Sequence, residues 1–250
     1  TRINNIDIGK DQSDLRVAVV SEPKASHRPV SPRLSLVGMM CLLGGMGVGV
    51  ALVYVLDVLD DRFRSPEELQ EQLRVPVLAM IRQLSVTEAA GLEAIQVHVA
   101  PESVESEAFR TLRTTLAFSG QDMERIAVTS TEPGDGKTTV IANLAVSCAH
   151  AGKRTLLIDC DLRRPGLTKL FEMRGRGGVS EILRSDGDIA AMCDERLQAT
   201  GIEGLDILPC GPKPSNPAEL LSDTRLSDLL AWAETHYDQI LVDCPPILAA

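Results

Sequence analysis

The chain has 250 residues, of which 44% are hydrophobic and 24% are charged, and its net charge is −10. This acidic balance argues against a nucleic-acid-binding protein, which usually carries a basic surface. The six cysteines show no C-x-x-C pair and no zinc-ligand spacing, so we interpret them as reduced thiols that pack inside a cytoplasmic domain.

The stretch 34–56 is the first strong feature along the chain. It contains no charged side chain, and a helix with a rise of about 1.5 Å per residue would cross a bilayer core of about 30 Å over this length. A signal peptide is disfavoured because the stretch is too long, follows 33 residues and lacks a small-residue cleavage site. A buried core helix is disfavoured because the stretch contains five glycines. We predict a transmembrane helix here.

The next part of the chain, residues 57–104, is predicted to be a cytoplasmic linker with a short helix and a short strand. Ser65, followed by proline and two acidic residues, predicts a helix over 65–73. The apolar run 75–81 predicts a short strand, and 82–104 a polar linker.

A helix is then expected from Val104 to about Phe118. Glu107, Arg110 and Arg113 recur in it at positions i, i+3 and i+6, roughly on one face. From the residues alone, this pattern is typical of an ordinary solvated, salt-paired helix face.

A Gly-rich turn follows the apolar residues 126–128, ends in Gly-Lys-Thr and precedes a helix predicted from Val140 to Ala151. This is the layout of a phosphate-binding loop, in which backbone N–H groups and the helix N-terminus hold phosphate oxygens. The usual pattern has a glycine where this chain has Thr131, so the loop needs support from elsewhere. The candidate nucleotide-binding residues are Pro133, Gly134, Asp135, Gly136, Lys137, Thr138 and Thr139.

Two further apolar runs, 154–159 and 239–243, end on carboxylates and have the character of buried parallel strands. Ligands of open α/β sheets bind at the carboxyl ends of strands, so Asp159, Asp161 and Asp243 should converge beside the loop. Carboxylates there could ligate Mg²⁺ or act as a base, although each could instead cap a turn. We predict an α/β fold with a P-loop NTPase-type, mostly parallel sheet flanked by helices, preceded by one transmembrane helix.

Taken together, these segments resemble the bacterial tyrosine kinases that are fused to polysaccharide chain-length determinants. Residues 133–139, 157–165 and 240–246 are similar to the family's Walker A, Walker A′ and Walker B motifs. Residues 211–222 are similar to its Gly-x-x-Pro-x-Asn-Pro-x-Glu-Leu-Leu stretch, and 107–113 to its E-x-x-R-x-x-R oligomerisation motif.

The resemblance implies a protein-tyrosine kinase, an ATP-dependent phosphotransferase, that uses Mg·ATP. Lys137 would neutralise β- and γ-phosphate charge, while Thr138, Asp159 and Asp243 would hold Mg²⁺. Asp159 or Asp161 would orient or deprotonate the attacking tyrosine hydroxyl, and the choice between these two stays open.

The resemblance also implies partners and a location. The kinase would autophosphorylate between subunits of a ring assembled through Glu107, Arg110 and Arg113, and would regulate capsular or exopolysaccharide polymerisation and export. Its partners would be itself, the polysaccharide machinery and the membrane, and not nucleic acid. The use of ATP places residues 57–250 in the cytoplasm and 1–33 in the periplasm of a bacterial inner-membrane protein, although the local charges weakly favour the opposite orientation.

The kinase domain is expected over residues 105–250. We expect both ends of the natural protein to be truncated, because Thr1 is not a natural start and the sheet lacks further elements after Asp243. A Tyr-rich tail would then lie beyond Ala250.

Two alternatives come from other functional classes. The ParA/MinD-type ATPases share the fold and the three motifs, but their phosphate loop has a signature lysine where this chain has Glu132. That difference favours a kinase over an ATPase switch without kinase activity. The second alternative is a structural co-polymerase with an inactive nucleotide domain.

Overall fold

In the computed structural model the chain divides into two compact units, Thr1–Arg64 and Ser65–Ala250. In the first unit, α1 (Leu34–Val58) is a helix of 25 residues without a buried side chain, and it is long and apolar enough to cross a membrane. The predicted helix is therefore present, with two more residues at its end. The expected periplasmic region 1–33 lies almost wholly outside the described residues, which are 31–60, 65–84, 91–119 and 123–249.

The second unit begins with α2 (Pro66–Leu73), which forms as predicted. The Ser65 side chain accepts a hydrogen bond from the Glu68 N–H at 3.2 Å, and Arg74 ends the helix in the left-handed conformation with a φ of 55°. The strand predicted over 75–81 is wrong, because this segment pairs with no strand. Three of its apolar side chains, Leu78, Ala79 and Ile81, pack against the core instead, whereas Val75 and Met80 are exposed.

Part of the predicted polar linker 82–104 is folded, which corrects that expectation. It contains η1 (Gly91–Ala94) and α3 (Gln96–Val99). Ile95, between these two elements, and Val97, within α3, are both buried. The Val97 N–H donates to Asn143 Oδ1 at 2.9 Å. The two buried residues are too few to give a periodic signal in the sequence.

Within the part of the chain that the structure describes, five strands form one sheet in the order β1-β5-β2-β4-β3. Neighbours among β1, β5, β2 and β4 are parallel, and the two-residue β3 pairs antiparallel with β4. The mostly parallel sheet is confirmed, although the short strands β3 and β4 were not predicted. The strands are β1 (Arg125–Val128), β2 (Thr155–Asp159), β3 (Gln198–Ala199), β4 (Leu205–Leu208) and β5 (Gln239–Asp243).

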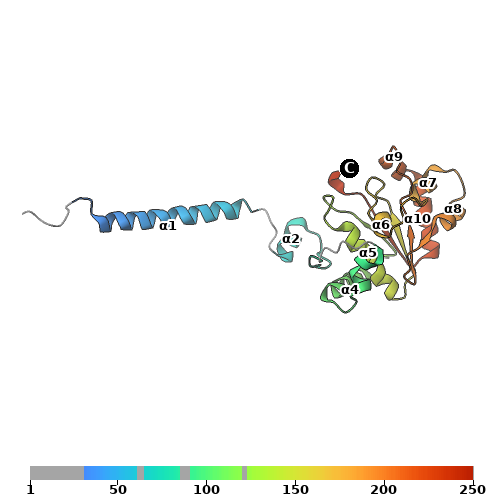
Figure 1. The fold of residues 1–250 in the computed structure, drawn as a ribbon, viewed down its shortest axis with the longest axis horizontal. Coiled ribbons are helices and arrows are strands. Elements are labelled where there is room, and N and C mark those ends of the chain that lie inside the picture. The colour runs from blue at the N-terminus through green and yellow to red at the C-terminus, as the bar shows by residue number, and fades with distance from the viewer. Residues whose placement is uncertain (1–30, 61–64, 85–90, 120–122, 250) are drawn as a thin grey trace, which may run out of the picture. The chain divides into compact units, whose positions relative to one another are not determined.

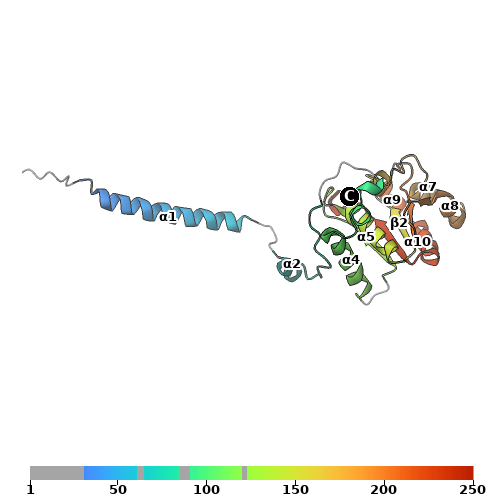
Figure 2. The same ribbon diagram turned by 60° about the horizontal axis from the view of Figure 1, so that its bottom comes forward.

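Helices cover both faces of the sheet, as Figures 1 and 2 show. One face carries α3, α4 (Val104–Ala117), α5 (Lys137–His150) and α6 (Gly166–Leu170), and the other carries α7 (Val179–Arg184), α8 (Ile189–Arg196) and α10 (Thr224–His236). Short elements complete the unit: α9 (Pro217–Leu221) and η2 (Ile247–Ala249).

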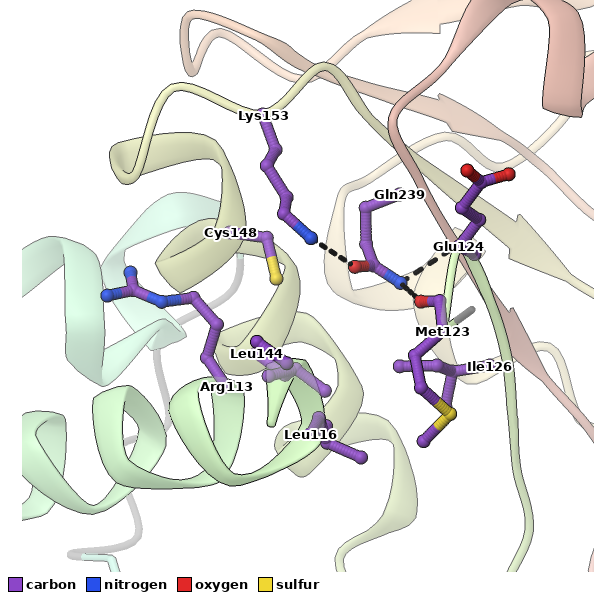
Figure 3. Close-up of a pocket in the computed structure, with 10 residues that line it drawn as sticks. Arg113, Leu116, Met123, Glu124, Ile126, Leu144, Cys148, Lys153 and Gln239 are labelled. Carbon is purple, nitrogen blue, oxygen red and sulfur yellow. Dashed lines mark hydrogen bonds between the residues drawn. The ribbon is translucent and has the colours of Figure 1, made fainter. Parts of the chain in front are cut away.

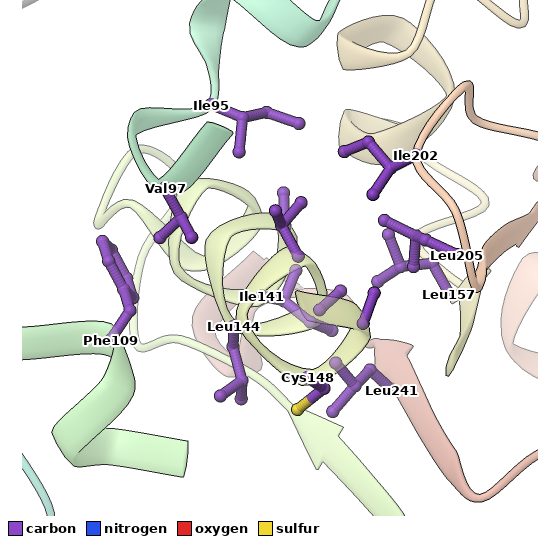
Figure 4. Close-up of a cluster of buried hydrophobic side chains, with 14 of the residues drawn as sticks. Ile95, Val97, Phe109, Ile141, Leu144, Cys148, Leu157, Ile202, Leu205 and Leu241 are labelled. Carbon is purple, nitrogen blue, oxygen red and sulfur yellow. The ribbon is translucent and has the colours of Figure 1, made fainter. Parts of the chain in front are cut away.

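Alternation along the strands supplies the two halves of the core. Leu157 and Leu241 point toward α5, where they meet Ile141 and Leu144 (Figure 4). The alternate residues of the two strands, Leu156 and Ile158 on β2 and Ile240 and Val242 on β5, face the opposite side of the sheet. There they form a second hydrophobic cluster with residues of α7, α8 and α10. Both faces of the central strands are therefore buried, as expected for a parallel sheet.

The register places the carboxyl ends of three strands at one edge. Asp243 on β5 lies opposite Val128 on β1 and opposite Asp159 on β2. Because α5 begins directly after the turn that follows β1, its N-terminus lies at the same edge.

Candidate nucleotide-binding site

The turn after β1 owes its shape to two glycines. Gly134 and Gly136 have φ values of 101° and 91°, which side chains other than glycine rarely adopt. Gly136 is the N-cap of α5, so the helix begins at Lys137, three residues earlier than predicted. Asp135 Oδ2 accepts a hydrogen bond from the Glu132 N–H at 2.8 Å, which braces the loop from within.

Lys137 and Thr138 meet two of the predicted carboxylates. The Lys137 ammonium forms an ion pair with Asp243 and lies 3.6 Å from Asp161 Oδ2. The Thr138 hydroxyl donates to Asp243 Oδ2 at 3.1 Å. The side chains of Lys137 and Asp161 are each 6% exposed and that of Asp243 is fully buried, so these charges interact with little screening by water.

Asp159 has a different environment. Its Oδ2 accepts from the backbone N–H of Thr168 at 2.8 Å and from the Thr168 hydroxyl at 2.7 Å, and its Oδ1 accepts from the Asp161 N–H at 3.2 Å. Both carboxylate oxygens of Asp159 thus accept hydrogen bonds from other residues of the protein. Asp159 is a neighbour of Asp243 in the sheet but has no ion pair with Lys137 among the contacts of the described residues.

Burial shifts the pKa of these carboxyls upward. It raises the pKa of Asp159 from 3.8 to about 7, despite the opposing hydrogen bonds from Thr168. The pKa of Asp243 is also raised by burial, which outweighs the favourable effect of Lys137 and Thr138. Asp159 and Asp243 therefore bind protons more readily than solvent-exposed aspartates would.

A cavity of about 520 Å³ opens over the loop. Asp161 lines it, whereas Asp159 does not, and the Asp161 Oδ1 accepts from the Arg164 N–H at 3.0 Å. Backbone N–H groups at a helix N-terminus beside a lysine favour an anion such as phosphate. The other lining residues are Ser130, Pro133, Gly134, Gly136, Lys137, Thr138, Thr139, Arg164 and Pro246.

The donor set at Thr138 and Asp243 fits Mg²⁺. Their Oγ1 and Oδ2 atoms lie side by side, and Mg²⁺ usually takes one or two protein oxygens and fills its other positions with substrate phosphate and water. Within the described residues no cluster of three or more His, Cys, Asp or Glu could hold a metal by itself. A magnesium ion here would therefore depend on the nucleotide for further ligands.

Sequence reasoning missed two residues behind the loop. A Cβ on Gly166, the first residue of α6, would overlap the Thr138 side chain, so only glycine fits there without a shift. Thr168 ties Asp159 to the chain after β4, because its hydroxyl also accepts from the Cys210 N–H at 2.9 Å. A glycine after Arg-Arg-Pro was the available signal for the first, and no sequence signal marked the second.

The three candidate oligomerisation residues do not act alike. Arg110 Nη1 lies 2.9 Å from Glu107 Oε2, and Arg110 Nη2 donates to the Pro101 carbonyl at 2.8 Å. Arg113 donates to the Ser147 carbonyl at 2.5 Å and to its hydroxyl at 3.3 Å, which links α4 to α5. The structure thus brings Glu107 and Arg110 together at the surface and directs Arg113 inward.

A smaller cavity of about 170 Å³ lies at the other end of α5 (Figure 3). Two of its polar side chains are paired, since the Lys153 ammonium donates to Gln239 Oε1 at 3.0 Å. The Gln239 amide in turn donates to the carbonyls of Met123 and Glu124, at 2.7 and 3.2 Å. This arrangement joins α5, β5 and β1, and its charged lysine has a protein partner.

Comparison with known proteins agrees with this geometry. The model of a family described as an AAA domain matches residues 123–250. A putative tyrosine-protein kinase in the cps region of Klebsiella pneumoniae is 31% identical over 262 residues, covering 99% of this chain and 36% of that protein. The tyrosine-protein kinase YwqD of Bacillus subtilis is 41% identical over 151 residues, covering 60% of this chain and 62% of that protein.

A solved structure gives the same result. The kinase domain of the Escherichia coli tyrosine kinase ETK superposes with a TM-score of 0.64 at 34% identity, covering 74% of each chain. The chain thus spans about a third of the Klebsiella relative and less than two thirds of the Bacillus relative.

Proposed function

Because this chain belongs to the bacterial tyrosine kinases of exopolysaccharide biosynthesis, we propose that it is part of a membrane-anchored protein-tyrosine autokinase that uses Mg·ATP. The observation that carries the proposal is the convergence of Lys137, Thr138, Asp161 and Asp243 around the cavity over the phosphate loop. In this site Lys137 neutralises charge on the outer phosphates and the loop N–H groups orient them.

Thr138 and Asp243 are the residues we propose as protein ligands of Mg²⁺. When bound, the ion would neutralise the charge that develops on the transferred phosphoryl group. Asp159, the third residue expected to hold the metal, has both oxygens engaged with Asp161 and Thr168, so we assign it the positioning of α6 instead.

We propose Asp161 rather than Asp159 as the base. Its carboxylate lines the cavity and lies 3.6 Å from the Lys137 ammonium, within reach of a tyrosine hydroxyl that approaches the outer phosphate. Asp159 does not line the cavity, and its Oδ2 accepts from the Thr168 hydroxyl. We propose that Asp161 accepts the tyrosine proton as the hydroxyl oxygen attacks.

The acceptor tyrosine comes from another segment or another subunit. The sequence of residues 65–249 contains one tyrosine, Tyr237. Its side chain is 9% exposed, and its hydroxyl donates to Asp206 Oδ2 at 2.9 Å. It precedes β5, whereas Asp243 ends that strand at the nucleotide edge. A ring assembled through the surface pair of Glu107 and Arg110 would bring a neighbour's tyrosine to the site.

The anchor we propose is α1, which has the length and composition of a membrane span. Residues 57–250 would be cytoplasmic, with a linker over 57–104 whose later part packs on the kinase domain of 105–250, and residues 1–33 would be periplasmic. The kinase would regulate the polymerisation and export of capsular or exopolysaccharide, as the cps-region relative supports. Its location would be the bacterial inner membrane.

The experiment that tests this function compares two neighbouring carboxylates in the full-length protein. Asp161→Asn should keep ATP binding but lower the formation of phosphotyrosine by about 10²-fold, in the range that a general base contributes. Asp159→Asn keeps an oxygen acceptor for Thr168 and should lower the formation of phosphotyrosine by less than about tenfold. Both rates are measured by phosphotyrosine mass spectrometry together with ADP release.

The outcomes separate the functional classes. An unchanged phosphotyrosine yield in Asp161→Asn would exclude this residue as the base. ADP release without phosphotyrosine in the unmodified protein would indicate an ATPase switch, and no ATP binding at all would indicate an inactive nucleotide domain.

A further inference from the structure

Three cysteines follow the ends of three neighbouring strands and form a row across the sheet. Asp159 and Asp243 are register partners on β2 and β5, so the residues after them, Cys160 and Cys244, face each other. The last register pair of β2 with β4 is Ile158 and Leu208, so Cys210, two residues further along, follows β4 on the other side of β2. We call Cys244, Cys160 and Cys210 the cysteine row.

The row lies on the face of the sheet opposite α5. All three side chains belong to the hydrophobic cluster under α7, α8 and α10 or pack against it. Cys160 and Cys210 are buried, at 2% and 1% exposure, whereas Cys244 is only partly buried. A reagent from solvent would therefore meet Cys244 first.

The backbone favours one pair within the row. The Cys160 N–H donates to the Asp243 carbonyl at 3.0 Å, so the ladder between β2 and β5 continues up to Cys160 and Cys244. Neighbouring strands lie about 4.8 Å apart, and disulfides join Cα atoms about 4.4–6.8 Å apart. The Cys210 N–H instead donates to Thr168 Oγ1, so its backbone departs from the sheet.

We propose that Cys160 and Cys244 are a reversible modification site, which hydrogen peroxide or a similar two-electron oxidant converts to a disulfide. Peroxide oxidises the Cys244 thiol to a sulfenic acid and is itself reduced to water. The Cys160 sulfur then attacks the sulfenic sulfur, the S–S bond forms, and the thiol proton leaves with the displaced hydroxyl as a second water. A dithiol reductant reverses the change.

The bond would act on the nucleotide site through the residue before Cys244. That residue, Asp243, holds both Lys137 and Thr138 on the opposite face of the sheet. Drawing the two sulfurs to bonding distance moves the end of β5, and with it this carboxylate. The disulfide therefore lowers nucleotide affinity, a consequence that rests on the proposed function.

The first test detects the bond itself, without any assay of activity. The full-length protein with Cys41→Ser, which removes the exposed thiol of α1, is treated with hydrogen peroxide and then with N-ethylmaleimide. Trypsin leaves the three cysteines of the row on separate peptides, because it cuts after Arg154, Arg163, Arg196 and Arg225 but not before proline. Mass spectrometry should find the peptide 155–163 joined to the peptide that begins at Leu226, and dithiothreitol should release them.

Matched variants test whether the cross-link joins Cys160 to Cys244. Cys160→Ser and Cys244→Ser should each abolish the cross-link, whereas Cys193→Ser, a buried cysteine of the same cluster, should leave it intact. Packing of small side chains is the competing explanation, and it predicts that every thiol stays free to react after denaturation. That result, or a link from Cys160 to Cys210, would overturn the proposal.

The second test measures the binding of a fluorescent ATP analogue before and after oxidation. Oxidised protein should bind at least about tenfold more weakly, in keeping with the sensitivity of such sites to small displacements, and dithiothreitol should restore binding. Cys244→Ser should be insensitive to peroxide and Cys210→Ser should respond like the parent. Unchanged affinity in cross-linked protein would overturn the effect on nucleotide. Absence of binding in the reduced protein would instead overturn the proposed function and leave the disulfide site standing.

Discussion

The two ends of α5 use similar residues in opposite ways. At the first end, Lys137 faces a cavity of about 520 Å³ together with the carboxylates of Asp243 and Asp161. At the other end, Lys153 follows the helix and donates to Gln239 beside a cavity of about 170 Å³. Charge beside an open cavity at the carboxyl edge of the sheet can bind a ligand, whereas the same charge paired within the fold joins secondary-structure elements.

The difference follows from the direction of the backbone. The N-terminus of α5 presents free N–H groups and a positive dipole to the cavity, which favours phosphate. Its C-terminus presents carbonyl groups, and Arg113 donates to one of them, that of Ser147. Lysine side chains of equal charge therefore have different roles at the two ends.

The largest expected effect comes from a comparison in which the lysine at each end of α5 is replaced by methionine. Lys137→Met should weaken ATP binding and turnover by about 10²-fold or more, because the charge on the outer phosphates loses its partner. Lys153→Met should change ATP affinity by no more than about threefold, because its ammonium donates to Gln239 at the other end of α5 and distant charges are screened. Isothermal titration with an ATP analogue measures both. A strong loss in the Lys153 variant would show that the second end also serves the nucleotide.

A smaller effect is expected from crowding the loop from behind. Gly166→Ala would push a methyl group into Thr138 and should weaken ATP binding by about tenfold, since overpacking costs about 1–3 kcal/mol. Gly187→Ala is the control, because the atoms nearest to its new methyl group would belong to the Ser185 and Met192 side chains. Equal affinities in the two variants would mean that α6 yields without disturbing Thr138.

A third comparison separates the two arginines of α4. Arg113→Ala should lower the free energy of unfolding by about 1–3 kcal/mol, because a charged hydrogen bond to α5 is lost. Arg110→Ala should lower the free energy of unfolding by less than about 0.5 kcal/mol, since its contacts with Glu107 and with the Pro101 carbonyl are both exposed to water. Denaturant unfolding measures stability, and sedimentation of the same proteins measures assembly. If Arg110→Ala destabilises the fold more than Arg113→Ala, the assignment of the two roles is reversed.

A dependence of stability on pH is also expected, and it concerns the carboxylate that α6 holds. Burial raises the pKa of Asp159 from 3.8 to about 7, so the folded state binds more protons than the unfolded chain between these values. The free energy of unfolding should therefore fall as the pH rises from about 4 to about 7, and Asp159→Asn should lose part of this dependence. Asp243, whose pKa is also raised, contributes in the same direction.

Asp238, before β5, is the control for the pH measurement. Its hydrogen bond with Arg154 lowers its pKa, so its contribution is lost only at lower pH. Asp238→Asn should therefore leave the trend between pH 5 and 7 unchanged. Thermal midpoints at pH 5 and pH 7 test this, and an equally steep trend in Asp159→Asn would rule out that residue as its source.

Much of the fold could be predicted from local patterns. Long periodic or apolar stretches gave α1, α4 and α5, and strand-end carboxylates located β2 and β5. Local patterns did not predict the short elements correctly. The apolar run 75–81 has strand-like composition but packs on the core without a partner strand. A strand depends on a neighbour that local sequence does not specify.

The sequence by itself located the phosphate loop, the lysine and hydroxyl at its end, and the edge at which the carboxylates meet. Glycine conformations are local, and the alternation of strands with helices favours parallel strands whose carboxyl ends share one edge. Only the tertiary structure distinguished Asp161 from Asp159, which follow the same strand two residues apart. The distinction comes from α6, whose Thr168 binds Asp159, while Asp161 lines the cavity. Likewise, the helical spacing grouped Arg113 with Arg110, and the packing of α4 on α5 separated them. Which polar groups find partners inside a fold depends on contacts between distant segments.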